Sequence, residues 1–178
     1  IYIASLGPKN VEVTAEIADG WIPVFFPPDK AMDVWGDVLA KGKANRDPSL
    51  PPLNIVAGGT LAIVDEDKAQ KIRDAGRFMV ALYVGGMGAK GKNFYNNIFR
   101  KYGYESEAEQ IQDLYLDGKK DEAMGLVPQE YLDATSLVGD EGQVRERVEA
   151  FKAAGVTQLQ ISPTGPNQLA DIEKVKTW

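Results

Sequence analysis

The chemistry open to this chain is limited by two residue types that it lacks. Its 178 residues include no histidine and no cysteine. Imidazole and thiolate metal ligands, histidine general bases and disulfide bonds are therefore excluded. Carboxylates, lysines, arginines, tyrosines and backbone groups remain, together with a cofactor or residues of another chain. We expect no metal site, and residue types alone identify no catalytic residue.

The turn Leu6-Gly7-Pro8-Lys9 is a candidate anion site. It joins the end of a predicted strand to the start of a predicted helix. The first N–H groups of a helix have no partner within it, and the helix dipole attracts negative charge there. Gly7 permits close approach of the backbone to a ligand, and Lys9 adds a positive charge. An ordinary strand–helix connection is the alternative.

A glycine-rich stretch matches two nucleotide-binding patterns incompletely. Residues 86–91 satisfy G-x-G-x-x-G, and with Lys92 they approach a P-loop. Asn93 stands where a P-loop needs Ser or Thr, and the helical period of residues 78–84 precedes the glycines where a Rossmann motif needs a strand. A hinge between helices is the favoured interpretation.

Apolar runs predict four strands, near residues 1–6, 21–25, 53–63 and 157–161, separated by amphipathic helices. This alternation predicts an α/β fold whose parallel strands are adjacent in that order. Residues 84–135 interrupt the alternation and are helical in composition. We expect them to form an insertion over the carboxyl ends of the strands, because long insertions in such folds often carry binding walls.

The composition of the chain limits the kinds of partner that it is expected to bind. Hydrophobic residues make up 44% of the chain, enough for a core, and the net charge of −6 argues against nucleic acid as the main partner. No run of about 18 apolar residues is present, so no membrane span is expected. No secretory signal is visible either, which favours a cytoplasmic location. The chain opens at Ile1 within an apolar run, as expected of a fragment.

Two runs near the start, residues 1–10 and 14–21, resemble the luciferase-like monooxygenase superfamily, in particular its actinobacterial oxidoreductases that use flavin or coenzyme F420. Further runs carry the resemblance through the chain: residues 81–88, 93–95, 111–116, 136–139 and 153–157. The resemblance implies the C-terminal half of a (β/α)8 TIM barrel. Residues 1–178 would form a single partial domain with barrel strands five to eight, and residues 84–135 would be inserted after strand seven. Such a chain alone would be incomplete and inactive.

The same resemblance implies an oxidoreductase that uses reduced FMN or F420 for hydride transfer or monooxygenation of a small organic substrate. The cofactor-binding residues that it implies are Leu6, Gly7, Pro8, Lys9, Val24, Phe25, Gly58 and Gly59. The substrate-pocket residues that it implies are Phe26, Thr60, Lys90, Lys92 and Asn93.

The resemblance leaves open the choice between FMN and F420, the substrate, and the choice between reductase and monooxygenase. The implied partner is the missing N-terminal half-barrel or a second chain, and a homo-oligomer is also consistent with a half-barrel surface. Phe25 and Phe26 end an apolar run, so core packing is the alternative to a ligand-facing wall. The alternative function is a non-catalytic α/β binding or regulatory domain with an open four-stranded sheet.

Overall fold

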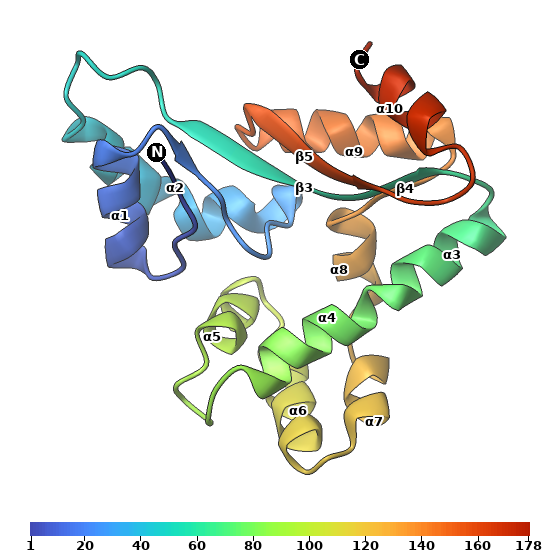
Figure 1. The fold of residues 1–178 in the computed structure, drawn as a ribbon. Helices are drawn as coiled ribbons and strands as arrows, with labels where there is room; N and C mark the ends of the chain where they lie inside the picture. The colour runs from blue at the N-terminus through green and yellow to red at the C-terminus, as the bar shows by residue number, and fades with distance from the viewer.

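In a computed structural model that describes all of residues 1–178, five parallel strands form one sheet. They are β1 (Tyr2–Ile3), β2 (Gly20–Trp21), β3 (Asn54–Ile63), β4 (Leu137–Gly139) and β5 (Gln158–Pro163). The central strand is β3. Its start pairs with β2 and its end with β4, and β5 runs beside most of its length (Figure 1).

Hydrogen bonds fix the strand order. The Asn54 N–H donates to the Asp19 carbonyl at the β2 side, whereas the next residue, Ile55, accepts from the Thr157 N–H. Successive residues of a strand direct their backbone groups to opposite edges, so β2 and β5 lie on opposite edges of β3. The predicted parallel order of the four runs is thereby confirmed.

The first two strands are much shorter than the predicted runs 1–6 and 21–25. Only two residues of each run form strand. β1 has a single neighbour, β2, and the chain soon turns into a helix at Pro8. After β2, Pro23 has no N–H to donate, and Phe25 adopts a φ of 54°, outside the strand region. β4 was not among the four predicted strands and forms because residues 137–139 pair in register with the end of β3.

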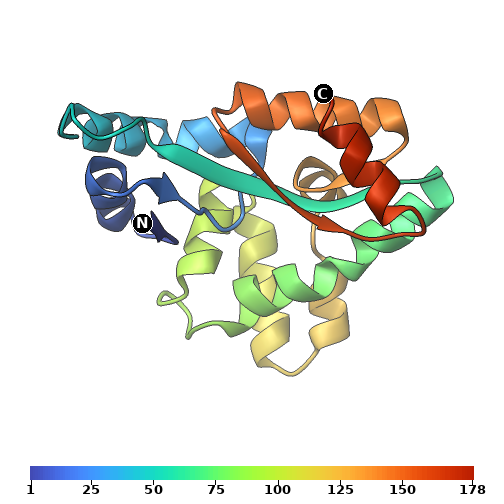
Figure 2. The same cartoon turned by 45° about the horizontal axis from the view of Figure 1, so that its top comes forward.

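Helices follow the signals in the sequence at their starts. They include α1 (Pro8–Ile17), α2 (Pro28–Ala44), α9 (Glu141–Ala153) and α10 (Gln168–Val175). Pro8 lies in the first turn of α1, and Asp140 with Gln143 forms the expected capping box of α9. Figures 1 and 2 show α9 and α10 along one side of the sheet, with α1 and α2 beside β1 and β2. No helix combines the length and the apolar composition needed to cross a lipid bilayer.

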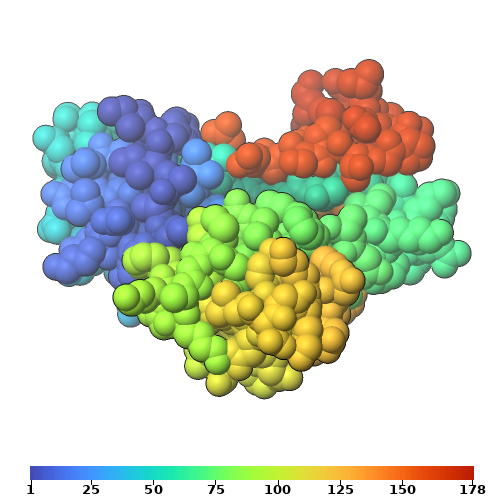
Figure 3. All heavy atoms as spheres, turned by 60° about the horizontal axis from the view of Figure 1, so that its bottom comes forward, coloured from blue at the N-terminus to red at the C-terminus, as the bar shows by residue number.

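Between β3 and β4 the chain forms only helices, and we call residues 66–134 the helical unit. It contains α3 (Glu66–Ala75), α4 (Arg77–Ala81), the π-helix η1 (Leu82–Gly86), α5 (Phe94–Lys101), α6 (Glu105–Leu116), α7 (Lys120–Gly125) and α8 (Gln129–Ala134). The unit forms one mass (Figure 3), and in Figure 1 it lies on the side of the sheet away from α9. Residues 86–91 therefore follow a π-helix rather than a strand, which excludes the Rossmann interpretation and agrees with a connection between helices.

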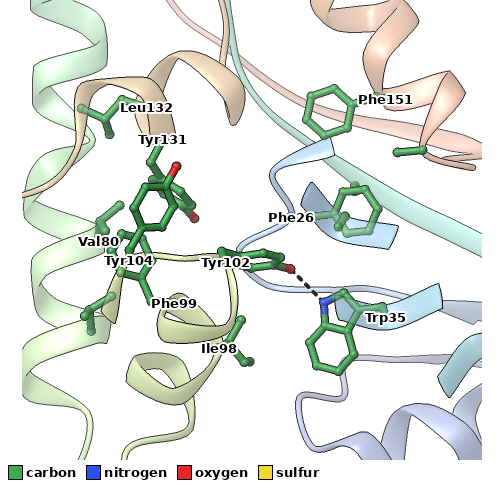
Figure 4. Close-up of a cluster of buried hydrophobic side chains, with 14 of the residues drawn as sticks. Phe26, Trp35, Val80, Ile98, Phe99, Tyr102, Tyr104, Tyr131, Leu132 and Phe151 are labelled. Atoms are coloured by element: carbon green, nitrogen blue, oxygen red, sulfur yellow. Dashed lines mark hydrogen bonds between the residues drawn. The ribbon is translucent and has the colours of Figure 1, made fainter. Parts of the chain in front are cut away.

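Aromatic side chains join the helical unit to the rest of the molecule (Figure 4). The indole Nε1 of Trp35 on α2 donates a buried hydrogen bond of 2.8 Å to the hydroxyl of Tyr102. The ring of Phe25, after β2, makes edge contacts with four rings of the unit: Tyr83, Tyr95, Phe99 and Tyr131. Such pairs stabilise beyond the area that they bury. The helical unit is thus fixed at the segment that follows β2.

Candidate functional site

The turn after β1 leaves backbone donors free. Gly7 precedes α1 with φ −82° and ψ 143°. The N–H groups of Gly7, Lys9 and Asn10 donate to no carbonyl and no side chain of the chain. Unpartnered donors at the start of a ten-residue helix are the groups that bind an anion. The structure therefore provides the donors on which the predicted anion site depends.

A pocket of about 450 Å³ opens beside this turn. It is lined by Ile3, Ala4, Ser5, Leu6, Gly7, Asn10, Val13, Thr14 and Phe94. Leu6 and Gly7 thus lie in its wall, whereas Pro8 and Lys9 are exposed outside its lining. A Cβ atom placed on Gly7 would meet only the ring of Phe94, at 4.0 Å. No titratable side chain lines the pocket, so these residues can bind and orient a ligand but cannot transfer a proton.

The residues after β2 have separate roles. Val24 is half-buried. Phe25 is the only non-glycine residue with a positive φ, a strained conformation that often marks functional sites. Phe26, predicted in the substrate pocket, is instead a core residue. It is 5% exposed and packs against Trp21 and Phe151, because the reversal at Phe25 directs the next side chain into the core.

Gly58 and Gly59 lie in the middle of β3, where neighbouring backbone comes very close. A Cβ atom on Gly58 would lie 2.0 Å from the Gln160 carbonyl oxygen, and one on Gly59 would lie 2.2 Å from the Thr135 carbonyl oxygen. The φ of Gly58, 156°, also disfavours other residues. Strand packing therefore already requires glycine at both positions, and the contact of these residues with a cofactor stays a prediction. Thr60 lines a small pocket of about 100 Å³ against the helical unit.

The predicted pocket residues of the helical unit lie in the connection between η1 and α5, and their side chains have different surroundings. Lys90 forms an ion pair with Asp113 inside the unit. Lys92 is exposed and makes no ion pair.

The side chain of Asn93 is buried and hydrogen-bonded within the protein, so it does not face a substrate. It is 1% exposed, and its amide nitrogen donates to the carbonyls of Tyr83 and Val84 at 2.9 and 3.0 Å. Its side-chain oxygen accepts from the backbone N–H groups of Tyr95 and Asn96. Asn93 therefore caps α5 and satisfies carbonyls of the π-helix, which corrects its predicted place in the substrate pocket.

Three polar residues of β5 were missed by sequence analysis. Gln158, Gln160 and Ser162 are exposed along one face of the strand. The register places Gln160 beside Gly58 and Ser162 beside Thr60. The alternation of polar and apolar residues over 158–162 is the signal that identifies them.

Two further features, a charged pocket and three tyrosines, are explained by the packing of the fold. A pocket of about 470 Å³ lies between α3, α8 and α9, and its arginines pair with its acids: Arg73 with Glu66, and Arg147 with Asp29. Burial raises the pKa of Tyr102, Tyr104 and Tyr131 above the ordinary range. These phenols stay protonated near neutral pH and cannot act as bases there.

Known proteins similar to this chain agree with the fold. The profile of the family described as luciferase-like monooxygenase matches residues 1–158. A Mycobacterium tuberculosis protein with the provisional name coenzyme F420-dependent oxidoreductase is 36% identical over 97% of this chain and 49% of its own length. A 5,10-methylenetetrahydromethanopterin reductase of Methanopyrus kandleri is 32% identical over 98% of this chain and 48% of its own. The chain spans about half the length of these relatives.

Two solved structures are also similar. The coenzyme F420-dependent tetrahydromethanopterin reductase from Methanopyrus kandleri matches with a TM-score of 0.66 and 28% identity, covering 98% of this chain and 48% of that one. An F420-dependent secondary alcohol dehydrogenase, solved with an F420-acetone adduct, matches with a TM-score of 0.61 and 18% identity over 99% and 46% of the two chains. The second likeness concerns the fold alone. Since the family profile covers most of a chain whose parallel α/β fold matches the reductase, this chain belongs to the luciferase-like monooxygenase family.

Proposed function

We propose that this chain is the C-terminal half of an F420-dependent oxidoreductase that transfers hydride to or from an organic substrate. One observation carries the proposal: free N–H groups follow the carboxyl end of β1, in a family member similar over nearly its whole length to proteins named for F420. TIM-barrel enzymes bind their ligands at the carboxyl ends of the strands. The names of these relatives support F420 rather than FMN.

In this proposal β1, β2, β3 and β5 are barrel strands five to eight. Residues 84–135 are then the insertion after strand seven. β1 pairs only with β2, and β5 pairs only with β3, so each has a free edge. The missing N-terminal half of a barrel, or a second chain in its place, would pair with those edges and complete the pocket.

The residues of the chain would act by binding and orienting the cofactor. When bound, F420 would supply the hydride chemistry. The N–H groups of Gly7, Lys9 and Asn10 would bind its phosphate, and Leu6 and Val24 would pack against its apolar parts. Lys9 and Lys92 are exposed and make no ion pair, so their charges are available for anionic groups of the cofactor.

Titration of F420 into the complete gene product tests the proposal, with Gly7→Val compared with Lys9→Ala. Gly7→Val should raise the Kd at least tenfold, because branched carbons would occupy the space where the phosphate approaches. The φ of Gly7 suits any residue and its Cβ position is open, so the variant should fold normally. Lys9→Ala should weaken binding by about 1 kcal/mol or less, as is usual for an exposed charge.

Circular dichroism would verify that both variants are folded. If folded Gly7→Val binds F420 as the wild type does, the phosphate site lies elsewhere. If the wild type binds FMN but not F420, the cofactor assignment is wrong.

A further inference from the structure

The two faces of β5 differ in polarity. Leu159 and Ile161 pack against the hydrophobic core, whereas Gln158, Gln160 and Ser162 are exposed. None of these three polar side chains makes a hydrogen bond within the chain. Parallel strands of α/β proteins are ordinarily apolar on both faces because both are buried. A polar face on such a strand is therefore suited to meeting a ligand rather than packed side chains.

Register places this face beside one of the predicted cofactor residues. Asn54 and Gly58 both belong to β3, and Gly58 pairs with Gln160. Residues two or four apart on a strand share a face. Gln160 therefore lies beside Gly58, on the face of the sheet that carries Asn54, Gly58 and Thr60. β1 and β2 end at Ile3 and Trp21, before Leu6 and Val24.

No charged side chain stands on this face, although charged residues make up 26% of the chain. Its strand positions are Tyr2, Gly20, Asn54, Val56, Gly58, Thr60, Gln158, Gln160 and Ser162. The cation near it is Arg73, which lines the small pocket at Thr60 and is already paired with Glu66 and Asp133. A charged ligand group held against these strand positions would lose water without gaining a counter-ion from them, which is unfavourable. The face offers hydrogen bonds from uncharged groups instead.

We propose that Gln160 is a specificity-determining residue of the substrate pocket and that the substrate is uncharged where it meets β5. This inference rests on the proposed function, because a substrate lies against this face only within an oxidoreductase barrel. The carboxamide of Gln160 both donates and accepts hydrogen bonds. It can therefore bind the oxidised and the reduced form of one substrate, even where a reaction turns an acceptor into a donor.

Matched pairs of compounds test the charge preference. In each pair a carboxylate replaces a methyl group: 2-butanol against 3-hydroxybutyrate, and 2-butanone against acetoacetate. The complete gene product is loaded with F420, and each compound is titrated while the fluorescence of bound F420 is followed. The neutral member of each pair should bind more tightly. Gln160→Leu should weaken its binding about tenfold, the effect of one lost hydrogen bond.

Gln158→Leu is the matched control, because it makes the same change on the same face nearer the amino end of β5, and it should leave binding unchanged. Gln160→Lys should reverse the preference within each pair. Preference of the wild type for the carboxylates, no response to either neutral compound, or equal effects of the two leucine variants would overturn the inference. Failure of the wild type to bind F420 would instead refute the proposed function.

Discussion

The hydrogen bond between Trp35 and Tyr102 joins α2 to the helical unit at one buried point. Tyr102→Phe would remove the acceptor and leave the indole N–H unpaired. We expect the free energy of unfolding to fall by about 1–3 kcal/mol, the usual penalty for an unsatisfied buried donor. Urea denaturation followed by tryptophan fluorescence would measure it.

Tyr83→Phe is the control for this prediction. Tyr83 belongs to the same aromatic junction, but its hydroxyl makes no hydrogen bond. Removal of this hydroxyl group should change the free energy of unfolding by less than about 0.5 kcal/mol. Equal losses in the two variants would show that the Trp35–Tyr102 bond contributes nothing specific.

The role of a residue could be predicted from the sequence where its hydrogen-bond partners lie close to it along the chain. Asp65 caps α3 through the Lys68 N–H, three residues away, and the Asp140 box is equally local. The positions of Phe26 and Asn93 were not predictable in this way. Phe26 packs against Phe151, far along the chain. Asn93 bonds to the carbonyls of Tyr83 and Val84 in the last turn of η1, and the place where that helix ends is set by its packing.

Among the elements, the π-helix η1 depends on glycine. Gly85 and Gly86 face Tyr115 of α6, and a Cβ atom on either would lie 2.5 Å from that side chain. We expect Gly85→Ala to destabilise the protein by about 1–3 kcal/mol, because the added methyl group overfills a close helix contact. Thermal and urea unfolding would measure the loss.

Gly125→Ala provides the comparison within α7, where a Cβ atom would meet nothing within 4 Å. That change should raise stability by up to about 1 kcal/mol, because alanine favours helix over glycine. Wild-type stability in Gly85→Ala would mean that the η1–α6 contact adjusts freely.

The ends of the elements were harder to predict than their types. Periodic apolar residues located α1, α2, α9 and the long strand β3. Apolar runs also suggested long strands at 1–6 and 21–25, yet pairing partners and the reversal at Phe25 limit each to two residues. An apolar run shows that a segment is buried, and only its neighbours determine how much of it is strand.

For the molecule as a whole, β1 has a free edge, and Val13 of α1 lines one pocket with Ile3 of β1. Val13 and Ile17, one turn apart on α1, are 48% and 59% exposed. We expect this 178-residue chain to self-associate in solution, because free strand edges and apolar patches bind other chains. Sedimentation velocity over a range of concentrations would measure it. The double variant Val13→Lys with Ile17→Lys should shift the distribution toward monomer.

Leu169→Lys is the control, since Leu169 is 81% exposed on α10, away from β1. It should leave association unchanged. A wild-type chain that stays monomeric at every concentration would contradict the expectation that this face needs a partner.

The order and direction of the strands were predictable because consecutive elements of an alternating chain usually lie side by side, which leaves few arrangements. The polar face of β5 was visible in the sequence as an alternation, but its place beside Gly58 depends on a register that only the folded sheet defines. The candidate site was therefore predictable at the turn after β1 and not across the sheet.

The pairing of β3 with β5 also has a consequence for synthesis on the ribosome. Ile55 bonds to Thr157, which is 102 positions later, so one edge of the ten-residue β3 stays open until β5 has been synthesised. At ordinary translation rates this interval is roughly 5–20 s, long enough for another nascent chain to pair with it. Glycine weakens strand pairing, and Gly58 with Gly59 lies at the centre of this open edge. The two glycines that the finished sheet requires for close packing thus also make the unfinished strand a poor template for aggregation.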